Sequence, residues 1–372
     1  MDKLVYITYQ SFPSIKANTF QTFENLKYIC LKVSHVELIF PKREITSSDN
    51  VELLNKSYEI PKNLKIEATH HNLPFGKFGY FKKLSYLFSH YYWSKKQCKK
   101  ISRNSNKFFI TRSDWVFYFL SKKGLKVTFE CHQLSKIRKI IMKKSIKYDK
   151  SKIIFLNKQL CLDSGIKLKK YDKKLIILQN GVDVSIFNGK IQKESGQLIF
   201  LGNLNRFDES RNLKFVIDCF KNPNLKKNYF LKIIGGPTSE VEVLNKYIQK
   251  HNLESRVVVK DRISRKLAIK EIESSEIGLL INSSKNIHSV KYTSPLKYFE
   301  YLYGELKILA VDFYSHKSLP FSENIVFFNE NNEDSFVAAL NSLENIEPIS
   351  KKNLEPISLE TRVSNILNFI NN

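Results

Sequence analysis

Cysteine is scarce in this chain of 372 residues, and the five that occur show no paired or regular spacing. The absence of a Cys-x-x-Cys pair argues against a structural zinc site, and the low count argues against a disulfide framework. The cysteines are therefore expected to be reduced thiols, as in a cytoplasmic protein. No apolar run approaches the roughly 18 residues that a membrane-spanning helix requires. The first residues predict a strand rather than a signal peptide.

Acidic residues are few in the first half of the chain. Residues 1–175 hold 36 Lys and Arg against 13 Asp and Glu, whereas residues 176–372 hold 25 against 23. A general lysine bias of the sequence would affect both halves alike. The net charge of +25 is thus concentrated in the N-terminal half, which predicts an anionic surface or partner for that half.

No acidic residue occurs between Glu67 and Asp114. Within this stretch, Phe75–Ile101 mixes Phe, Tyr and Trp with lysine, a composition typical of segments at the surface of an anionic membrane. A second basic run, Lys136–Lys152, would extend that surface. The alternative is that the aromatic side chains pack inward and the lysines are merely solvated. An anionic glycan would also explain the charge.

Short apolar runs alternate with helical patterns, and the alternation restarts after residue 196. Strands separated by helices predict parallel sheets with helices on both faces, hence an α/β protein with two domains in tandem. The expected domains are 1–178 and 179–355, followed by an amphipathic helix within 356–372. Strands are expected at 4–9, 36–40, 107–111, 127–130, 152–156, 198–201, 229–234, 256–259, 277–281, 307–311 and 325–328, and helices at 19–31, 114–121, 135–147, 211–220, 241–250, 265–273, from 294, and at 358–370.

The segment Ser294–Tyr301 predicts the start of a helix able to hold an anion. Ser294 is a favourable N-cap and Pro295 suits the first helical position. The free N–H groups and the dipole of that end attract phosphate, and Lys297 adds a full positive charge. Glu300 lies roughly 9 Å further along the helix, about the distance from a diphosphate to its ribose, whose hydroxyls a carboxylate accepts. An ordinary capped helix with a solvated glutamate is the alternative.

Three turns follow expected strands of the second half: Gly202–Leu204, Gly235–Gly236 and the turn before Ser294. In open parallel sheets, ligands bind beyond the carboxyl ends of the strands. The three turns therefore point to one crevice, which favours the phosphate-binding interpretation of the Ser294 helix.

The order of the motifs carries a resemblance that covers nearly the whole chain and is strongest from residue 175 onward. The motifs are Thr111–Arg112, Glu130–His132, Asn180–Asp183 with Phe187, Phe200–Leu204 with Arg211, Ile233–Gly236, Ser294–Tyr301 and Lys307–Asp312. At these spacings, the set resembles a retaining glycosyltransferase of family 4, a group 1 glycosyltransferase with the GT-B fold.

This resemblance implies two Rossmann-like domains facing an interdomain cleft, with the C-terminal helix crossing back to the basic, acceptor-binding first domain. It implies transfer, with retention, of a hexose-type sugar from a nucleotide-diphosphate sugar held mainly by the second domain. The implied acceptor is a glycan or a lipid-linked molecule, in cell-surface polysaccharide or glycolipid synthesis. The protein would be cytoplasmic or peripheral on the inner face of the membrane. No metal or cofactor is expected, and the chain lacks an Asp-x-Asp motif for a diphosphate-bound cation.

The resemblance also assigns roles to individual residues. Glu300 matches the ribose-binding glutamate of the family. Arg211, or the nearby Arg206, matches a member of the basic pair that neutralises the diphosphate together with Lys297. His132 matches a histidine near the donor hexose and is the expected catalytic residue. Positions expected near the donor and its sugar are Gly202, Asn203, Tyr292, Ser294 and Leu296.

Two departures from the family pattern concern the sugar and the acceptor. Tyr292 stands where the family usually has a glutamate that contacts sugar hydroxyls. The chain therefore resembles the variants that read Ser-Pro-x-Lys-x-x-Glu, and the identity of the sugar stays open. The loop after the first strand lacks the paired glycines usual in the family. Asn18 and Thr19 are expected to supply hydrogen bonds there.

Two other functions remain alternatives. A nucleotide-sugar epimerase of the same fold would need further acid and base groups facing the cleft, and the first half has few acids to offer. A basic nucleic-acid-binding protein would stack bases on aromatic side chains. The chain shows no recognised nucleic-acid motif, so no nucleic-acid partner is expected.

Overall fold

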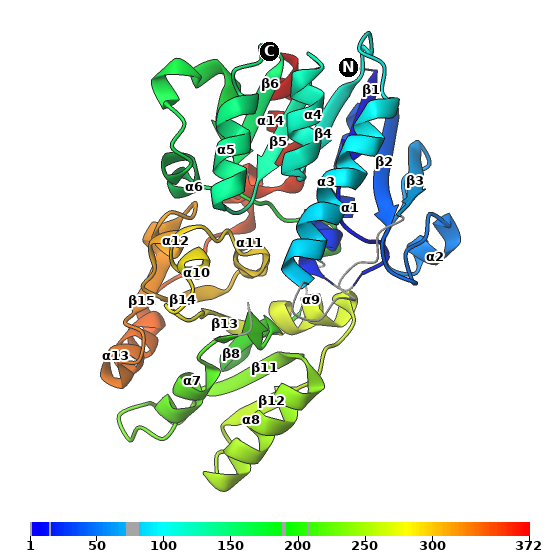
Figure 1. Cartoon of the computed structure of the whole chain (residues 1–372). Coiled ribbons are helices and arrows are strands. Elements are labelled where there is room, and N and C mark those ends of the chain that lie inside the picture. The colour runs from blue at the N-terminus through cyan, green and yellow to red at the C-terminus, as the bar shows by residue number, and fades with distance from the viewer. Residues whose placement is uncertain (1, 15, 72–81, 188–190, 207–208) are drawn as a thin grey trace. The chain divides into compact units, whose positions relative to one another are not determined.

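The computed structural model describes residues 2–14, 16–71, 82–187, 191–206 and 209–372. Contacts between residues divide the chain into two units, Met1–Leu178 with Arg362–Asn372, and Gln179–Thr361. Each unit is built on a parallel sheet that carries helices (Figure 1). The predicted fold, two α/β domains with parallel sheets, is therefore confirmed.

The first unit has a seven-stranded sheet of order β3-β2-β1-β4-β5-β6-β7, with every pairing parallel. Its inner strand β5 is buried at every position because helices cover both faces of a parallel sheet. The strands are β1 (Lys3–Ile7), β2 (His35–Lys42), β3 (Leu64–His70), β4 (Phe108–Thr111), β5 (Val127–Cys131), β6 (Ser151–Phe155) and β7 (Leu175–Ile177). The helices are α1 (Ala17–Lys32), α2 (Val51–Asn55), α3 (Lys82–Lys100), α4 (Asp114–Lys122), α5 (Lys136–Ser145) and α6 (Lys158–Asp163).

The second unit has a six-stranded parallel sheet of order β12-β11-β8-β13-β14-β15, and a short antiparallel pair, β9 and β10. Its strands are β8 (Glu194–Asn203), β9 (Asn205–Arg206), β10 (Glu209–Ser210), β11 (Phe230–Gly236), β12 (Val257–Lys260), β13 (Ser275–Leu280), β14 (Lys307–Val311) and β15 (Ile325–Phe328). Its helices are α7 (Leu213–Cys219), α8 (Thr238–Lys250), α9 (Arg265–Ser274), α10 (Ile287–Lys291), α11 (Leu296–Tyr303), α12 (Tyr314–Lys317) and α13 (Glu333–Ser342).

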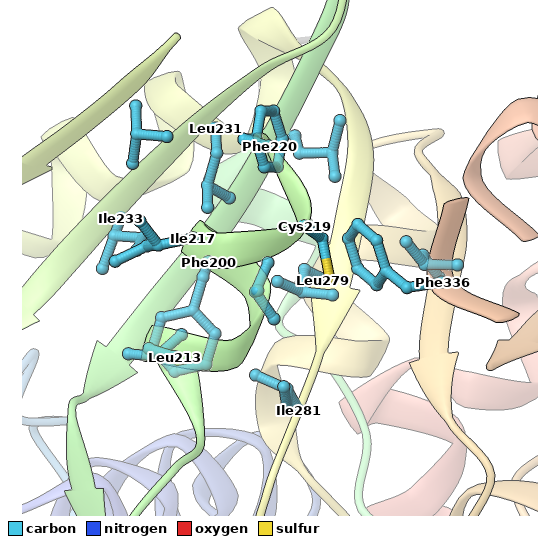
Figure 2. Close-up of a cluster of buried hydrophobic side chains, with 14 of the residues drawn as sticks. Phe200, Leu213, Ile217, Cys219, Phe220, Leu231, Ile233, Leu279, Ile281 and Phe336 are labelled. Atoms are coloured by element: carbon cyan, nitrogen blue, oxygen red, sulfur yellow. The ribbon is translucent and has the colours of Figure 1, made fainter. Parts of the chain in front are cut away.

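One of the buried clusters of the second unit packs α7 and α13 against β8, β11 and β13 (Figure 2). The apolar side chains of α7 recur at helical spacing and face the sheet, where Phe200 is fully buried. Burying one such side chain stabilises the fold by about 1.5–3 kcal/mol. This packing fixes the end of β8, from which the candidate site is built.

The last helix, α14 (Leu359–Asn371), begins in the second unit and continues in the first. Within the first unit, Arg362 donates to the side chains of Asn25 and Glu130, and Lys152 Nζ lies 2.6 Å from the carbonyl oxygen of Phe369. The expected return of the C-terminal helix to the first domain is thus observed.

Several elements were not anticipated from the sequence, among them β3 and α3. The edge strand β3 places Lys65 and Glu67 between apolar positions, which weakens its hydrophobic signal. The expected membrane segment Phe75–Ile101 falls partly outside the described residues, which resume at position 82. From there on it is α3, whose aromatic side chains divide between its two faces: Trp93 is buried, while Phe88 is exposed. Among the described helices, none has the length and apolar character to cross a bilayer.

Candidate active site

The strand order of the second sheet reverses beside β8. The chain runs from β8 outward to β11 and β12 on one side, and then returns to β13 on the other. Ligands of open parallel sheets bind at such a switch point, beyond the carboxyl ends of the strands. Gly202 and Asn203 end β8 there, and Asn282 follows β13.

Glycine is required at this edge because backbones approach closely. Gly202 has a φ of 131°, a conformation that residues with a side chain rarely adopt. A Cβ on Gly235 would stand 1.8 Å from the carbonyl oxygen of Gly202. Asn203 Oδ1 accepts a hydrogen bond of 2.6 Å from Arg262, which orders the exposed end of β8.

Three cationic side chains converge on this edge from different elements. Arg206 comes from β9 and donates to Thr293 Oγ1 at 3.2 Å, and Arg211 donates to Asn282 Oδ1 at 2.7 Å. Lys297, from the first turn of α11, has its Nζ 3.6 Å from the centroid of the Phe200 ring. Among the residues that the structure describes, neither Lys297 Nζ nor Arg211 Nε has a hydrogen-bond partner, although both atoms are buried.

The three cations are held against a strong electrostatic penalty. Burial lowers the pKa of Lys297 well below its usual value, and Arg211 and Arg206 lower it further. Burial and the nearby Arg206 lower the pKa of Arg211 to about 9, and burial lowers that of Arg206 to about 10. Burying several charges of one sign close together is costly. An anion with several acceptor oxygens would satisfy the free donors and remove the repulsion, and a diphosphate has this chemistry.

Arg211 was expected to begin a helix, and that expectation was wrong. Asn212 adopts the left-handed conformation, with a φ of 63°, and α7 begins only at Leu213. Arg211 therefore lies in the connection between β10 and α7. Its backbone N–H donates to Leu204 O at 3.1 Å, which ties this connection to the residue after β8.

The helix α11 also starts later than expected. Its first residue is Leu296, Pro295 occupies the N-cap position, and no side chain caps the helix. The prediction of Ser294 as N-cap is therefore wrong. The hydroxyl oxygen of Ser294 instead accepts a hydrogen bond of 3.2 Å from the backbone N–H of Asn180, so this residue ties two loops together.

Glu300 lies one helical turn after Lys297, on the same side of α11. The residue is buried, with 9% of its surface exposed, and its carboxylate pairs with Arg265 at 2.6 Å. The next residue, Tyr301, accepts a hydrogen bond from the N–H of Leu201 at 3.0 Å, which anchors α11 to β8. The structure therefore brings Glu300 and the three cations into the same unit, as the sequence predicted. Tyr292 and Leu296 flank them in the chain and are partly exposed.

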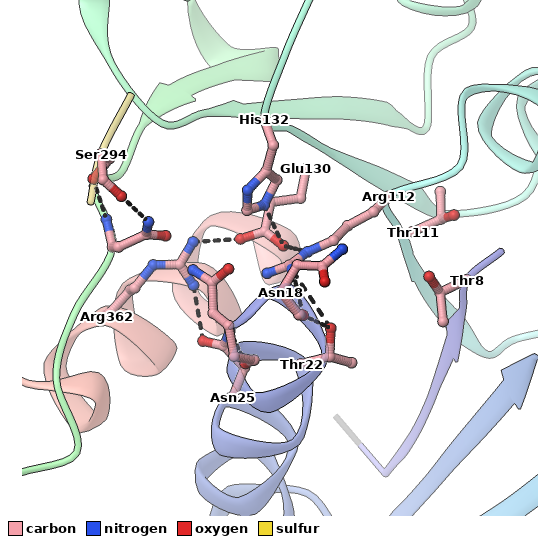
Figure 3. A network of polar contacts seen from close by, with 12 residues as sticks. Thr8, Asn18, Thr22, Asn25, Thr111, Arg112, Glu130, His132, Ser294 and Arg362 are labelled. Carbon is pink, nitrogen blue, oxygen red and sulfur yellow. Dashed lines mark hydrogen bonds and ion pairs between the residues drawn. The ribbon is translucent and has the colours of Figure 1, made fainter. Parts of the chain in front are cut away.

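His132 belongs to a polar network of the first unit (Figure 3). The buried carboxylate of Glu130 accepts from Arg112 Nε at 2.7 Å and from Arg362, and it lies 3.3 Å from His132 Nε2. Burial, with Arg112 next in effect, lowers the pKa of His132 to about 4, so the ring is neutral at physiological pH. Its side chain remains 25% exposed and lies directly after β5, at the carboxyl edge of the sheet.

The acceptor-side residues lie at the start of α1 in the same unit. Asn18 is exposed, and its backbone carbonyl accepts from Arg112 at 3.2 Å. The hydroxyl of Thr19 lies 2.6 Å from Lys16 O and 3.0 Å from Ser14 O. Carbonyl oxygens only accept, so the hydroxyl hydrogen of Thr19 is used within this loop. Asn18 is thus the better placed of the two for a ligand, and its role stays a prediction.

Sequence reasoning missed Arg265 and His316. The cation that pairs with Glu300 comes from a helix expected at 265–273, but nothing in the sequence linked that helix to α11. His316 lies in α12, a four-residue helix that no periodic pattern could reveal. Only the folded arrangement shows that either residue is close to the donor-site candidates.

No protein-family model and no curated protein sequence matches the chain. Solved structures do. A sucrose-phosphate synthase from Thermosynechococcus elongatus matches with a TM-score of 0.69 and 12% identity, over 100% of this chain and 98% of its own. HepE from Anabaena, solved with UDP and glucose, matches with a TM-score of 0.65 and 10% identity over 100% of both chains. A lipopolysaccharide outer core galactosyltransferase, WaaB, matches with a TM-score of 0.64 and 15% identity over 99% of both chains.

These neighbours, and two trehalose-6-phosphate synthases with similar coverage, share one architecture of two Rossmann-like domains. The chain therefore has the GT-B fold. At identities of 10–15%, the likeness establishes the fold and leaves the chemistry to the residues of this chain.

Proposed function

We propose that this protein is a glycosyltransferase that binds a nucleotide-diphosphate sugar at the switch point of its second unit. The observation that carries the proposal is that Arg206, Arg211 and Lys297 converge on this edge. Two of their buried donor atoms, Arg211 Nε and Lys297 Nζ, are satisfied by no described residue. The neighbouring carboxylate of Glu300 fits the hydroxyls of a ribose. One of the structural neighbours, HepE, was solved in complex with UDP and glucose, which supports this ligand class.

The proposed chemistry follows from charge. When a sugar leaves its diphosphate, negative charge grows on the phosphate oxygens, and preorganised cations stabilise it where it develops. Lys297 and Arg211 are held in place before the ligand arrives, so little reorganisation is needed at the moment of reaction. The transfer is proposed to retain the configuration of a hexose-type sugar, on the strength of the family resemblance alone.

His132 is proposed to lie beside the donor sugar. As a neutral imidazole it can exchange hydrogen bonds with hydroxyls without adding a charge, and Glu130 orients it. Glu130 itself is occupied by two arginines, which leaves it unsuited to act as a general base. This arrangement supports transfer over an epimerase, which would need free acid and base groups.

The acceptor is proposed to be a glycan or lipid-linked molecule reached from an anionic membrane surface. On α3, Leu84, Phe88 and Tyr92 are exposed at successive helical turns, and Lys95 and Lys99 continue the same outward stripe. The helices α3, α4 and α5 lie side by side in the first unit (Figure 1), and α5 adds exposed isoleucine and lysine side chains. Apolar and cationic side chains on one face suit the interface of an anionic bilayer.

Vesicle co-sedimentation tests the membrane proposal. The double variant Lys95→Gln, Lys99→Gln should lose binding to vesicles with anionic lipid at low salt. The control Lys246→Gln, Lys250→Gln removes the same charge from exposed positions on α8 of the second unit and should bind as the wild type does. Equal binding by both variants would remove the membrane surface from the proposal.

A panel of nucleotide-diphosphate sugars tests the enzyme. One member should raise the melting temperature, and the stabilisation should grow with its concentration. The same sugar donor, mixed with glycan or lipid-extract acceptors, should release nucleoside diphosphate. Conversion of the donor to an epimer without release would instead identify the epimerase.

A further inference from the structure

A buried histidine of the second unit has an unused ring nitrogen. His316 is 0% exposed, and its Nδ1 lies 2.8 Å from the carbonyl oxygen of Val311. A carbonyl only accepts, so Nδ1 carries the hydrogen, and in the neutral ring Nε2 presents a bare lone pair. Among the described residues, Nε2 has no hydrogen-bond partner although it is buried. Such atoms are rare in folded proteins and indicate a missing partner.

The helix that carries His316 is attached to the segment leading into the donor site. The hydroxyl of Ser315 donates to Ser289 O on α10 at 2.7 Å. Four residues further along, Thr293 accepts the hydrogen bond from Arg206. These contacts connect α12, through α10 and the residues after it, to the residue that Arg206 binds.

A second attachment leads to the same place. Gln179 donates from its side chain to Ser318 O, one residue beyond α12, at 2.8 Å. The adjacent Asn180 binds both the hydroxyl and the carbonyl oxygen of Ser294, just before α11. One short segment thus ties the end of α12 to the start of the helix that carries Lys297.

The charged groups that act on His316 come from three places around it. Besides burial, Arg206 on β9 and Lys297 on α11 lower the pKa of His316, and Asp312 in the turn after β14 raises it. Asp312 is itself paired with Lys317 at 2.7 Å. Phe313 stacks on the ring, with centroids 5.9 Å apart. The imidazole thus lies within the electrostatic influence of two cations of the proposed donor site.

We propose that His316 is a fourth phosphate-binding group of the donor site: neutral in the free protein, it takes up a proton from solvent at Nε2 when the diphosphate binds, and then donates a hydrogen bond to a phosphate oxygen. The inference rests on the proposed donor site. The proton adds to the lone pair, Nδ1 keeps its hydrogen bond to Val311, and no other bond changes.

The electrostatics give the direction of this proton uptake. In the free protein, burial first, and then Arg206 and Lys297, lower the pKa of His316 to about 4, while Val311 and Asp312 act in the opposite sense. A diphosphate introduces negative charge among those cations, which reverses the field at the ring and raises the pKa. At pH 7 the ring is neutral before binding and becomes protonated once its pKa in the complex exceeds 7.

Calorimetric titration with inorganic pyrophosphate and with UDP, in two buffers of different ionisation enthalpy at pH 7, measures the protons taken up. Lys297 can also take up a proton on binding, so Lys297→Arg, which stays charged, provides the background. In that background, His316→Asn should reduce the uptake by about one proton and weaken pyrophosphate binding roughly tenfold or more. Asparagine keeps a donor for Val311 and removes Nε2.

A second variant, His316→Gln, distinguishes the uptake of a proton at position 316 from the hydrogen bond donated to the phosphate. The amide nitrogen of His316→Gln lies near the position of Nε2 and can donate without titrating, so this variant should retain more affinity than His316→Asn while losing the same proton. Unchanged proton uptake in both variants, with melting temperatures like that of the parent, overturns the inference. If the wild type binds neither pyrophosphate nor UDP, the donor site fails and the inference fails with it.

Discussion

The Nζ atom of Lys297 lies 3.6 Å from the centroid of the Phe200 ring, over the buried core of the second unit. The face of an aromatic ring attracts a cation by about 0.5–2 kcal/mol. That attraction offsets only part of the cost of burying an ammonium group that has no hydrogen-bond partner among the described residues. The free protein therefore holds Lys297 in a state that an anion would relieve.

Replacing Lys297 with Met should stabilise the free protein by about 1–3 kcal/mol, because it removes a buried unsatisfied charge and keeps the volume. Urea denaturation measures the change. The matched control is Lys307→Met, which removes a lysine paired with Glu276 at 3.0 Å and should lower stability. A loss of stability in Lys297→Met as large as in the control would show that Lys297 is compensated in the fold.

The stability of the free protein should rise with pH above neutrality. The folded-state pKa values of Lys297, of Arg211 (about 9) and of Arg206 (about 10) are depressed, so the folded protein releases protons that the unfolded chain still holds. Stability therefore increases as pH rises through the folded-state values toward the unfolded ones. Denaturation between pH 7 and 10, compared with Lys297→Met, measures the contribution of that lysine. If the free energy of unfolding of the wild type and of Lys297→Met changed with pH in parallel, the depressed pKa of Lys297 would be contradicted.

Glu300→Gln should distinguish recognition of the ribose from recognition of the diphosphate. The variant should weaken UDP or another nucleoside diphosphate by about 1.5–3 kcal/mol, since hydrogen bonds to a charged group are lost, and leave inorganic pyrophosphate unaffected. Calorimetric titration with both ligands measures the loss of affinity for the nucleoside diphosphate relative to that for pyrophosphate. Glu305→Gln is a control from two residues beyond α11, where the carboxylate lies 4.0 Å from Lys351 Nζ. A parallel loss of pyrophosphate binding in Glu300→Gln would place Glu300 at the phosphates instead.

The network around His132 should make the first unit sensitive to acid. The pKa of His132 is lowered to about 4 in the fold, so the unfolded chain takes up its proton first, and stability falls as the pH drops from about 6.5 toward 4. Glu130, whose pKa is well below its usual value despite burial because Arg112 and Arg362 surround it, adds a further loss at lower pH. Denaturation of His132→Asn over this range should show a shallower dependence, and an unchanged slope would contradict the assignment.

Glu130→Gln should destabilise the protein by about 3–5 kcal/mol, because it removes a buried counter-charge that Arg112 and Arg362 share. The double variant Glu130→Gln, Arg362→Met should recover part of that loss, since it also removes one of the two buried positive charges. Denaturation of the single and double variants measures the coupling. Additive losses would show that the pair does not act as a unit.

The parallel sheets could be predicted because their strands are continuous apolar runs with helical patterns between them. Edge strand β3 and the short helices α10 and α12 could not, since each is shorter or more polar than a periodic pattern requires. Of the donor-site candidates, Lys297 and Glu300 were named from the pattern of the Ser294 helix, and Arg211, with Arg206 as its alternative, from the family resemblance. The fold places all four in the second unit.

The residues that contact these candidates could not be predicted from the sequence. The ion pair between Arg265 and Glu300 and the proximity of His316 to Lys297 join segments that are distant along the chain. The helix start at Ser294 was misjudged for a similar reason. Its hydroxyl is engaged by Asn180, more than a hundred residues earlier, so the local capping rule did not decide its role.

The central claim is that Arg206, Arg211 and Lys297 form a diphosphate site. Calorimetric titration of UDP, GDP, ADP and TDP against the wild type and Lys297→Met tests it most directly. At least one nucleoside diphosphate should bind the wild type at a single site and bind Lys297→Met about ten- to a hundredfold more weakly. Equal affinity in the two proteins, or no binding by any of the four, would contradict the account.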